Sequence, residues 1–412
     1  MMTVQADNKY YIELEERYGA HNYHPLPVVL AKGEGVYVWD VEGKKYLDCL
    51  SAYSAVNQGH CHPEIIDTLV EQAKTLTLTS RAFYNNVLGE FEKFATELFG
   101  YDKLLPMNTG AEGVETAIKL ARKWGYLKKG IPDGQAQIIV CRQNFHGRTT
   151  TIVSFSTDPS ARNGFGPYTP GFINIPYNDI SALEKVLQSQ HSVVAGFLVE
   201  PIQGEAGVIV PDDGYLKNAY ELCKKYNVLF IADEIQTGLG RTGKMLACDY
   251  ENVHPDILIL GKALGGGVFP VSAVLADDEI MLCIQPGEHG STFGGNPLAC
   301  KIAITALKVI VNEHLAENAY RMGEIFRNGL RDIQKKTDLI SIVRGKGLLN
   351  AIVINEKDNI TAWDICLKFA ENGLLAKPTH GNIIRLAPPL IINEYQIKEA
   401  LEIIEKSVVG IV

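Results

Sequence analysis

The chain has 412 residues, of which 39 are basic and 48 acidic, and its formal net charge is −9. Hydrophobic residues make up 46% of the chain and charged residues 21%, which excludes the highly charged disordered class and predicts a globular protein with a large buried core. The acidic balance argues against nucleic-acid and anionic-membrane surfaces, so we expect small molecules as partners.

The N-terminal stretch MMTVQADNKYYIELEERYG has neither the basic and apolar regions of a signal peptide nor the acid-poor composition of an organelle transit peptide. We therefore expect a cytoplasmic protein. The most apolar long window, 257–276, contains Lys262, consecutive glycines and a proline, so we expect no membrane span.

Eight cysteines are scattered with no CxxC pair, which favours reduced thiols over a disulfide framework. His60, Cys61 and His62 have metal-binding side chains, but three adjacent residues hardly converge on one tetrahedral ion. We expect no metal site.

The first part of the chain predicts a hairpin, because residues 37–56 alternate apolar and polar side chains around the turn-forming EGK. The pattern becomes helical from about residue 64. From about residue 100, helices such as 213–226 alternate with apolar runs at 137–141, 150–156, 193–201, 228–234, 257–264 and 271–278. Runs that are apolar throughout predict an α/β fold with a mainly parallel sheet and helices on both faces.

After about residue 300 the pattern predicts two helices, a strand, a further helix and a short strand, which form a smaller α+β region. We therefore divide the chain into an N-terminal segment with the hairpin (1–55), a large domain (56–300) and a small domain (301–412).

The segment LLPMNTGAEGVETAIKLARKWGY predicts a short strand, a turn and a helix that begins after Thr109, Gly110 and Ala111. Free backbone amides at a helix N-terminus, beside a glycine that allows close approach, suit a phosphate group. A capped helix that merely packs on a sheet is the alternative interpretation.

Two charged residues follow neighbouring apolar strands. Asp233 ends VLFIA, and Lys262 follows ILILG, so both lie where α/β sheets bind their ligands. Apolar surroundings lower the pKa of a lysine and make its amine a usable nucleophile. The alternatives are a helix-capping or surface acid and a lysine that reaches solvent.

Together, the helix terminus, Lys262 and Asp233 suit one ligand. Pyridoxal phosphate has a phosphate for the helix, an aldehyde for the lysine and a basic ring nitrogen for the carboxylate.

The stretches IADEIQTGLGRTG, LGKALGGG, HGSTFGGNPLA, FHGRT and VEPIQGEAGV resemble the class III aminotransferases, which are pyridoxal-phosphate enzymes of fold type I. The resemblance runs in order over essentially the whole chain. The stretches GAHNYHPLP, SAYSAVNQGHCHP, LTSRAFYNN, PYND and GLLAKPTHG resemble the branch of that class that acts on ornithine.

The resemblance implies a role for each residue that contacts the cofactor. Lys262 would bind its aldehyde covalently, and Asp233 would pair with its pyridine nitrogen. Gln236 would hydrogen-bond the phenolic oxygen, and Phe145 would stack on the ring. The next residue, His146, stands where members of the ornithine branch can carry tryptophan.

The phosphate, by the same resemblance, would be held by the turn at Thr109 and by the amides of Gly110 and Ala111. Thr292 would join them from a partner subunit. This implies a homodimer with shared active sites.

Substrate recognition needs two carboxylate sites, because ornithine and glutamate carry different charges. The resemblance implies that Arg148 and Arg385 bind carboxylates bidentately. Glu205 would pair with Arg385 while ornithine binds and release it for glutamate or 2-oxoglutarate. Tyr23 and Tyr53 would line the substrate pocket, with Tyr23 taking the α-amino group of ornithine. Ordinary surface ion pairs and packing tyrosines are the alternatives.

The implied activity moves the δ-amino group of L-ornithine to 2-oxoglutarate, giving glutamate and glutamate 5-semialdehyde, with a place in arginine metabolism and proline biosynthesis. Another ω-aminotransferase, acting on N-acetylornithine, 4-aminobutyrate or lysine, is the nearest alternative. A decarboxylase or racemase of the same fold would not need two carboxylate sites with a gate. A non-enzymatic binding protein would not need Lys262 beside Asp233.

Overall fold

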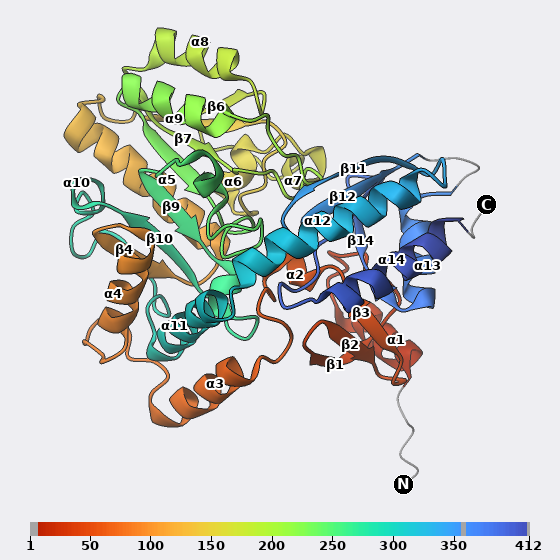
Figure 1. Cartoon of the computed structure of the whole chain (residues 1–412). Coiled ribbons are helices and arrows are strands. Elements are labelled where there is room, and N and C mark those ends of the chain that lie inside the picture. Colours follow the sequence, from red (N-terminus) through yellow and green to blue (C-terminus); the bar gives the residue numbers. More distant parts are fainter. Residues whose placement is uncertain (1–6, 356–359, 410–412) are drawn as a thin grey trace.

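The computed structural model describes residues 7–355 and 360–409, so the first six residues of the stretch used to predict the compartment lie outside it. Its largest sheet has seven strands (Figure 1). In spatial order they are β4 (Lys103–Met107), β10 (Ser272–Ala276), β9 (Ile257–Leu260), β8 (Leu229–Asp233), β7 (Val194–Val199), β5 (Gln137–Cys141) and β6 (Phe172–Ile175). Strands β9, β8, β7, β5 and β6 pair in parallel, whereas β10 is antiparallel to both of its neighbours. The predicted α/β fold with a mainly parallel sheet is confirmed.

Helices cover both faces of this sheet, which explains why its strands are apolar throughout. On β5, Ile138 and Val140 pack in one core with α5 (Gly110–Trp124). Ile139 and Cys141 point to the opposite face, where α8 (Ile180–Gln190) and α9 (Tyr215–Lys225) complete a second core. Successive side chains of a strand alternate between the faces, so each face needs its own apolar set.

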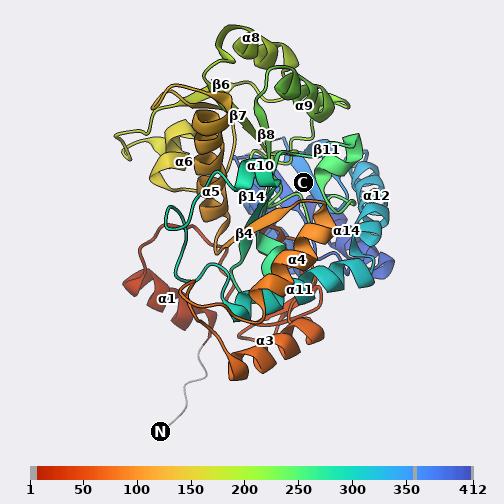
Figure 2. The ribbon, with the colours of Figure 1, turned by 90° about the vertical axis from the view of Figure 1, so that its left-hand side faces the viewer.

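Three helices pack together at one end of the molecule (Figure 2). They are α3 (Pro63–Thr75), α4 (Leu88–Phe99) and α11 (Pro297–Asn312). Helix α11 begins where the Asn296 side chain accepts a hydrogen bond from the amide of Ala299 at 2.8 Å, with proline in its first turn.

A separate region contains two smaller sheets and three helices. One sheet has the order β11 (Ile340–Lys346), β12 (Leu349–Ile354), β15 (Ile383–Leu386) and β14 (Lys377–Thr379). The other has the order β1 (Leu30–Glu34), β2 (Tyr37–Asp40), β3 (Lys45–Asp48) and β13 (Leu374–Leu375). The helices are α12 (Leu315–Gln334), α13 (Ala362–Asn372) and α14 (Glu394–Val409).

Both chain ends contribute to this region, because β13 pairs in parallel with β3 of the predicted N-terminal hairpin. The smaller α+β part of the fold is thus built from an N-terminal segment and the C-terminal part. The boundaries at 55/56 and 300/301 stay a proposal.

The predicted strand at 150–156 is wrong. These residues form helix α6 (Thr150–Phe155), and the side chain of Thr149 caps it by accepting a hydrogen bond from the Ile152 amide at 3.3 Å. The β-branched run favours a strand locally, but the cap and the burial of Ile152 and Phe155 outweigh that preference.

The remaining elements are short or terminal. The α-helices among them are α1 (Asn8–Tyr18), α2 (Ser51–Ser54), α7 (Pro159–Arg162) and α10 (Asp278–Met281), and the other helical turns are η1 (Gly125–Lys129), η2 (Ala247–Glu251) and η3 (Lys262–Gly265). No helix within the described ranges combines the length and apolarity that crossing a bilayer requires.

A buried arginine joins the two regions. The wholly buried Arg241 donates hydrogen bonds to the Asn57 side chain and to the carbonyls of Leu348 and Pro388, at 2.6, 3.0 and 2.6 Å. Burial lowers the pKa of this guanidinium to about 9. Truncating Arg241 would leave these three buried acceptors without their donor, which would destabilise the fold. Through these bonds, the loop after β8 that carries Arg241 is tied to the small region.

Candidate active site

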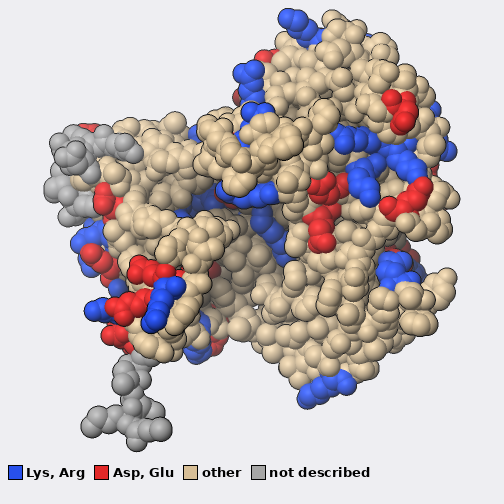
Figure 3. All heavy atoms as spheres, turned by 180° about the vertical axis from the view of Figure 1, so that it is seen from behind, with Lys and Arg blue, Asp and Glu red and all other residues tan. Residues whose placement is uncertain are grey.

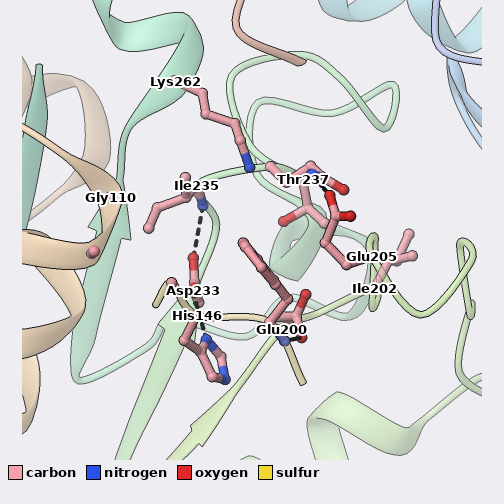
Figure 4. Close-up of a pocket in the computed structure, with 13 residues that line it drawn as sticks. Gly110, His146, Glu200, Ile202, Glu205, Asp233, Ile235, Thr237 and Lys262 are labelled. Atoms are coloured by element: carbon pink, nitrogen blue, oxygen red, sulfur yellow. Dashed lines mark hydrogen bonds and ion pairs between the residues drawn. The ribbon is translucent and has the colours of Figure 1, made fainter. Parts of the chain in front are cut away.

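A cavity of about 180 Å³ opens at the carboxyl ends of β8 and β9. The Lys262 amine and the Asp233 carboxylate point into the same space (Figure 4). Other residues that line it include Gly110, Ala111, Phe145, Glu200, Glu205 and Gln236. The structure therefore brings most of the predicted cofactor residues into one cavity.

Lys262 is the first residue of η3 and is separated from β9 by Gly261 alone, and its backbone is left-handed, with φ of 47°. A side chain in that region is strained, which is frequent at functional sites. Burial lowers the pKa of its amine, although the negative charges of Glu205 and Asp233 act in the opposite direction. A larger fraction of the amine is therefore uncharged, and nucleophilic, than for a lysine in water.

Asp233 is the last residue of β8 and is 5% exposed. Its Oδ1 accepts a hydrogen bond from the Ile235 amide at 3.1 Å, and its Oδ2 lies 2.6 Å from Nδ1 of His146. The carboxylate is thus held from two sides.

The N-terminus of α5 has a capping box. The Thr109 hydroxyl accepts a hydrogen bond from the Glu112 amide at 3.2 Å, and the Glu112 carboxylate accepts one from the Thr109 amide at 2.7 Å. Thr109 lines a neighbouring cavity, together with Gly110 and Lys262. A Cβ on Gly110 would lie 3.0 Å from a methyl carbon of Ile235, so this turn favours glycine.

The two residues of the predicted gate lie in contact. Nη1 of Arg385 is 2.5 Å from Oε1 of Glu205, and the Arg385 guanidinium lies 4.7 Å from the ring centroid of Tyr53. Burial alone would raise the pKa of Glu205, but Arg385 lowers it below its ordinary value. Nε2 of Gln236 also faces Glu205, at 3.4 Å, and Oε1 of Gln236 is buried with no hydrogen-bond partner among the described residues.

Glu200 is a cavity residue that the sequence analysis missed. It is 7% exposed and its carboxylate accepts the Phe145 amide at 3.0 Å. Burial raises its pKa to about 7. It directly follows the apolar strand β7, and an acidic residue at the carboxyl end of an apolar strand is the same signal that identified Asp233 at the end of β8.

Six predicted residues do not line this cavity. Thr109 lines the neighbouring cavity, Arg385 contacts the lining residue Glu205, and Tyr53 contacts Arg385.

The other three predicted residues are Tyr23, Thr292 and Arg148. Tyr23 is 74% exposed and lines a separate cavity beside α1 and Trp363. Thr292 is exposed on the loop before α11. Arg148 is exposed, with its guanidinium 5.8 Å from the Phe145 ring centroid.

Comparison with known proteins identifies the family. The aminotransferase class-III family matches residues 18–408. The chain belongs to the class III aminotransferases. It is 66% identical to the mitochondrial ornithine aminotransferase of Drosophila melanogaster, a match that covers 96% of this chain and 90% of that protein.

Two solved structures extend the comparison. An ornithine aminotransferase of Toxoplasma gondii with partial occupancy of pyridoxal phosphate is 50% identical, with a TM-score of 0.96 over 98% of this chain and 94% of that one. An acetylornithine aminotransferase of Elizabethkingia anophelis is 62% identical, with a TM-score of 0.91 over 98% of this chain and 100% of that one.

Class III aminotransferases use pyridoxal phosphate, and this cavity fits it. It presents an amine of lowered pKa, a carboxylate held in place and free amides at a helix N-terminus. Within the described ranges, no group of three or more histidine, cysteine, aspartate and glutamate side chains has a metal-binding arrangement.

Proposed function

We propose that this chain is an ornithine δ-aminotransferase. It transfers the δ-amino group of L-ornithine to 2-oxoglutarate, giving glutamate and glutamate 5-semialdehyde, which cyclises to pyrroline-5-carboxylate. One observation carries the choice of substrate: Glu205, which lines the same cavity as Lys262, pairs with Arg385, in a chain closely similar to ornithine aminotransferases.

Transfer from N-acetylornithine is the second candidate, because the relative from Elizabethkingia anophelis is named for it. The two donors differ at the α-amino group, which carries a charge only in ornithine. A panel of ornithine, N-acetylornithine, 4-aminobutyrate and lysine, each with 2-oxoglutarate, tests the proposal. We expect ornithine to have the highest kcat/KM. A higher value for N-acetylornithine would favour the second candidate.

The cofactor residues have distinct proposed roles. Bound pyridoxal phosphate supplies a ring that accepts the electron pair left at the substrate carbon when its proton departs. Lys262 binds the cofactor and moves that proton, which the lowered pKa of its amine allows. Asp233 holds a proton at the ring nitrogen, and Phe145 packs on the ring face.

The turn at Thr109 and the amides of Gly110 and Ala111 hold the phosphate of the cofactor. Gln236 donates a hydrogen bond to its phenolic oxygen.

Each of two arginines binds one carboxylate of the substrates. Arg148, exposed beside Phe145, binds the carboxylate farther from the reacting carbon, which is the α-carboxylate of ornithine and the side-chain carboxylate of glutamate. Arg385 binds the second carboxylate of glutamate or 2-oxoglutarate once Glu205 releases it. Figure 3 shows basic side chains within a hollow between two parts of the surface, a distribution suited to anionic substrates.

Glu205→Ala is expected to change the two half-reactions unequally. Without the carboxylate, Arg385 stays available, so the half-reaction with glutamate is spared while that with ornithine slows by about ten- to a hundredfold. Single-turnover measurement of each half-reaction checks this. Glu313→Ala, which removes the partner of His62 outside the cavity, is the control and should change neither. Equal losses in both half-reactions would indicate a purely structural ion pair.

Tyr23→Phe tests the recognition of ornithine. The hydroxyl is proposed to bind the charged α-amino group, and such a hydrogen bond is worth roughly tenfold to 150-fold in kcat/KM. We expect that loss for ornithine and much less for 4-aminobutyrate, which has no α-amino group. Tyr18→Phe, at a similarly exposed tyrosine of the same segment, is the control. Unchanged kcat/KM for ornithine would make Tyr23 a packing residue.

A homodimer with shared active sites completes the proposal, with Thr292 reaching the phosphate of the partner subunit. Exposed aromatic side chains support an interface, because Phe83, Tyr84 and Phe293 are 73%, 105% and 51% exposed. Light scattering should give the mass of two chains, and the mass of one chain would contradict the proposal.

We propose the cytoplasm as the compartment, which is the expectation stated in the sequence analysis. The relative from Drosophila melanogaster is named as mitochondrial, so fractionation of the source cells is the test, and recovery in mitochondria would contradict the proposal. Arginine metabolism and proline biosynthesis are the proposed setting, because the substrate and the product belong to those conversions.

A further inference from the structure

His146 and Asp233 form a buried pair beneath the cavity. The His146 side chain is 0% exposed, and its Nδ1 lies 2.6 Å from Oδ2 of Asp233. A carboxylate oxygen in such a contact accepts, so Nδ1 carries the hydrogen and donates. The donated bond points at the carboxylate assigned to the pyridine nitrogen, from the side away from the cavity centre (Figure 4).

The imidazole ring is held in place by its neighbours. It packs against the ring of Phe155, with centroids 6.0 Å apart, and Phe155 is fully buried. The backbone beside it is fixed by Glu200, which accepts the Phe145 amide at 3.0 Å. A donor fixed by both packing and backbone can impose one orientation on its acceptor.

The negative charges around the imidazole ring favour its protonated form, which can donate to Asp233. Burial by itself lowers the pKa of His146, but the hydrogen bond to Asp233 and the negative charges of Asp233 and Glu200 raise it above its ordinary value. Nε2 of His146 is buried and has no hydrogen-bond partner among the described residues, so the contact with Asp233 is the polar bond that the ring makes.

We propose that His146 is a positioning residue: it donates to Oδ2 of Asp233 and fixes the carboxylate in the orientation that receives the ring nitrogen of the cofactor. The Ile235 amide holds Oδ1 from the other side, so a remaining lone pair faces the cavity. The inference rests on the proposed role of Asp233 and assigns His146 no contact with the substrate.

Binding of pyridoxamine 5′-phosphate to the cofactor-free full chain tests this proposal without turnover. The compound lacks the aldehyde, so its affinity reports the non-covalent contacts and not the bond to Lys262. His146→Phe keeps an aromatic ring and removes the donor, and we expect the dissociation constant to rise about tenfold. His146→Asn places an amide donor near the position of Nδ1 and should restore most of the affinity.

A ligand change separates positioning from general structural damage. In the 1-deaza analogue of pyridoxamine 5′-phosphate, carbon replaces the ring nitrogen, so the contact with Asp233 is absent. His146→Phe should then change the affinity less than about twofold. His254→Phe, a histidine that stacks on Tyr101 away from the cavity, is the control and should bind both ligands normally. Equal losses with both ligands would overturn the proposal, as would unchanged binding of the parent compound.

A second readout uses no ligand. In the cofactor-free chain, the ¹⁵N spectrum of histidine should show His146 with a hydrogen on Nδ1 and protonated to a higher pH than a free histidine. Its signal is assigned by its loss in His146→Asn. An Nδ1 without hydrogen would overturn the inference, while the activity with ornithine could stand.

Discussion

Lys262→Ala is expected to lose steady turnover by at least about a thousandfold, because proton transfer by a positioned group alone contributes about 10²- to 10⁴-fold and the nucleophile is lost as well. No other lysine lines the cavity among the described residues. Stopped-flow absorbance with ornithine measures the remaining rate, and the purified variant should lack the visible absorption band of the covalently bound cofactor.

Lys129 provides the matched comparison for Lys262. Burial also lowers the pKa of its amine, to about 8, but this amine donates to the carbonyls of Val194 and Tyr226, away from the cavity. Borohydride reduction should therefore fix the cofactor to the peptide of Lys262 and leave that of Lys129 unlabelled. Label on any other lysine would contradict the assignment.

Asp233→Ala is expected to retain bound cofactor but to slow both half-reactions by about a hundred- to a thousandfold. Without the carboxylate the ring nitrogen loses its proton near neutral pH, and the electron pair at the substrate carbon is poorly stabilised. The loss should shrink as the pH falls, because solvent then supplies that proton. Single-turnover rates between about pH 6 and 9 measure this.

Glu234→Gln is the control for Asp233→Ala. Glu234 is the next residue and fully buried, and burial raises its pKa to about 7, but it does not line the cavity. The variant should keep both half-reactions and the pH dependence of the parent. If Asp233→Ala kept most of the activity, that result would contradict the proposed role of this carboxylate.

Much of the site could be predicted because neighbouring parallel strands end at the same edge of a sheet. Asp233 ends β8, Lys262 follows β9, and the two strands pair in parallel, so the order of the strands brings both side chains to one cavity. The helix terminus at Gly110 joins them because α5 packs on the same sheet.

The bond between His146 and Asp233 could not be predicted from local pattern. It depends on the orientation of a loop that Glu200 fixes from a third strand. The helix at Thr150–Phe155 was misread because its β-branched residues pack against buried neighbours that are remote in sequence.

The proposal is tested most directly by finding which of the two amino groups of ornithine is transferred. The enzyme is incubated with 2-oxoglutarate and L-ornithine that carries ¹⁵N at the δ-amino group. The products are then separated, and their masses are measured by mass spectrometry. Transfer of the δ-amino group predicts ¹⁵N-glutamate together with unlabelled pyrroline-5-carboxylate, whose ring nitrogen comes from the α-amino group. Unlabelled glutamate with ¹⁵N retained in the other product would show transfer of the α-amino group and contradict the proposed function.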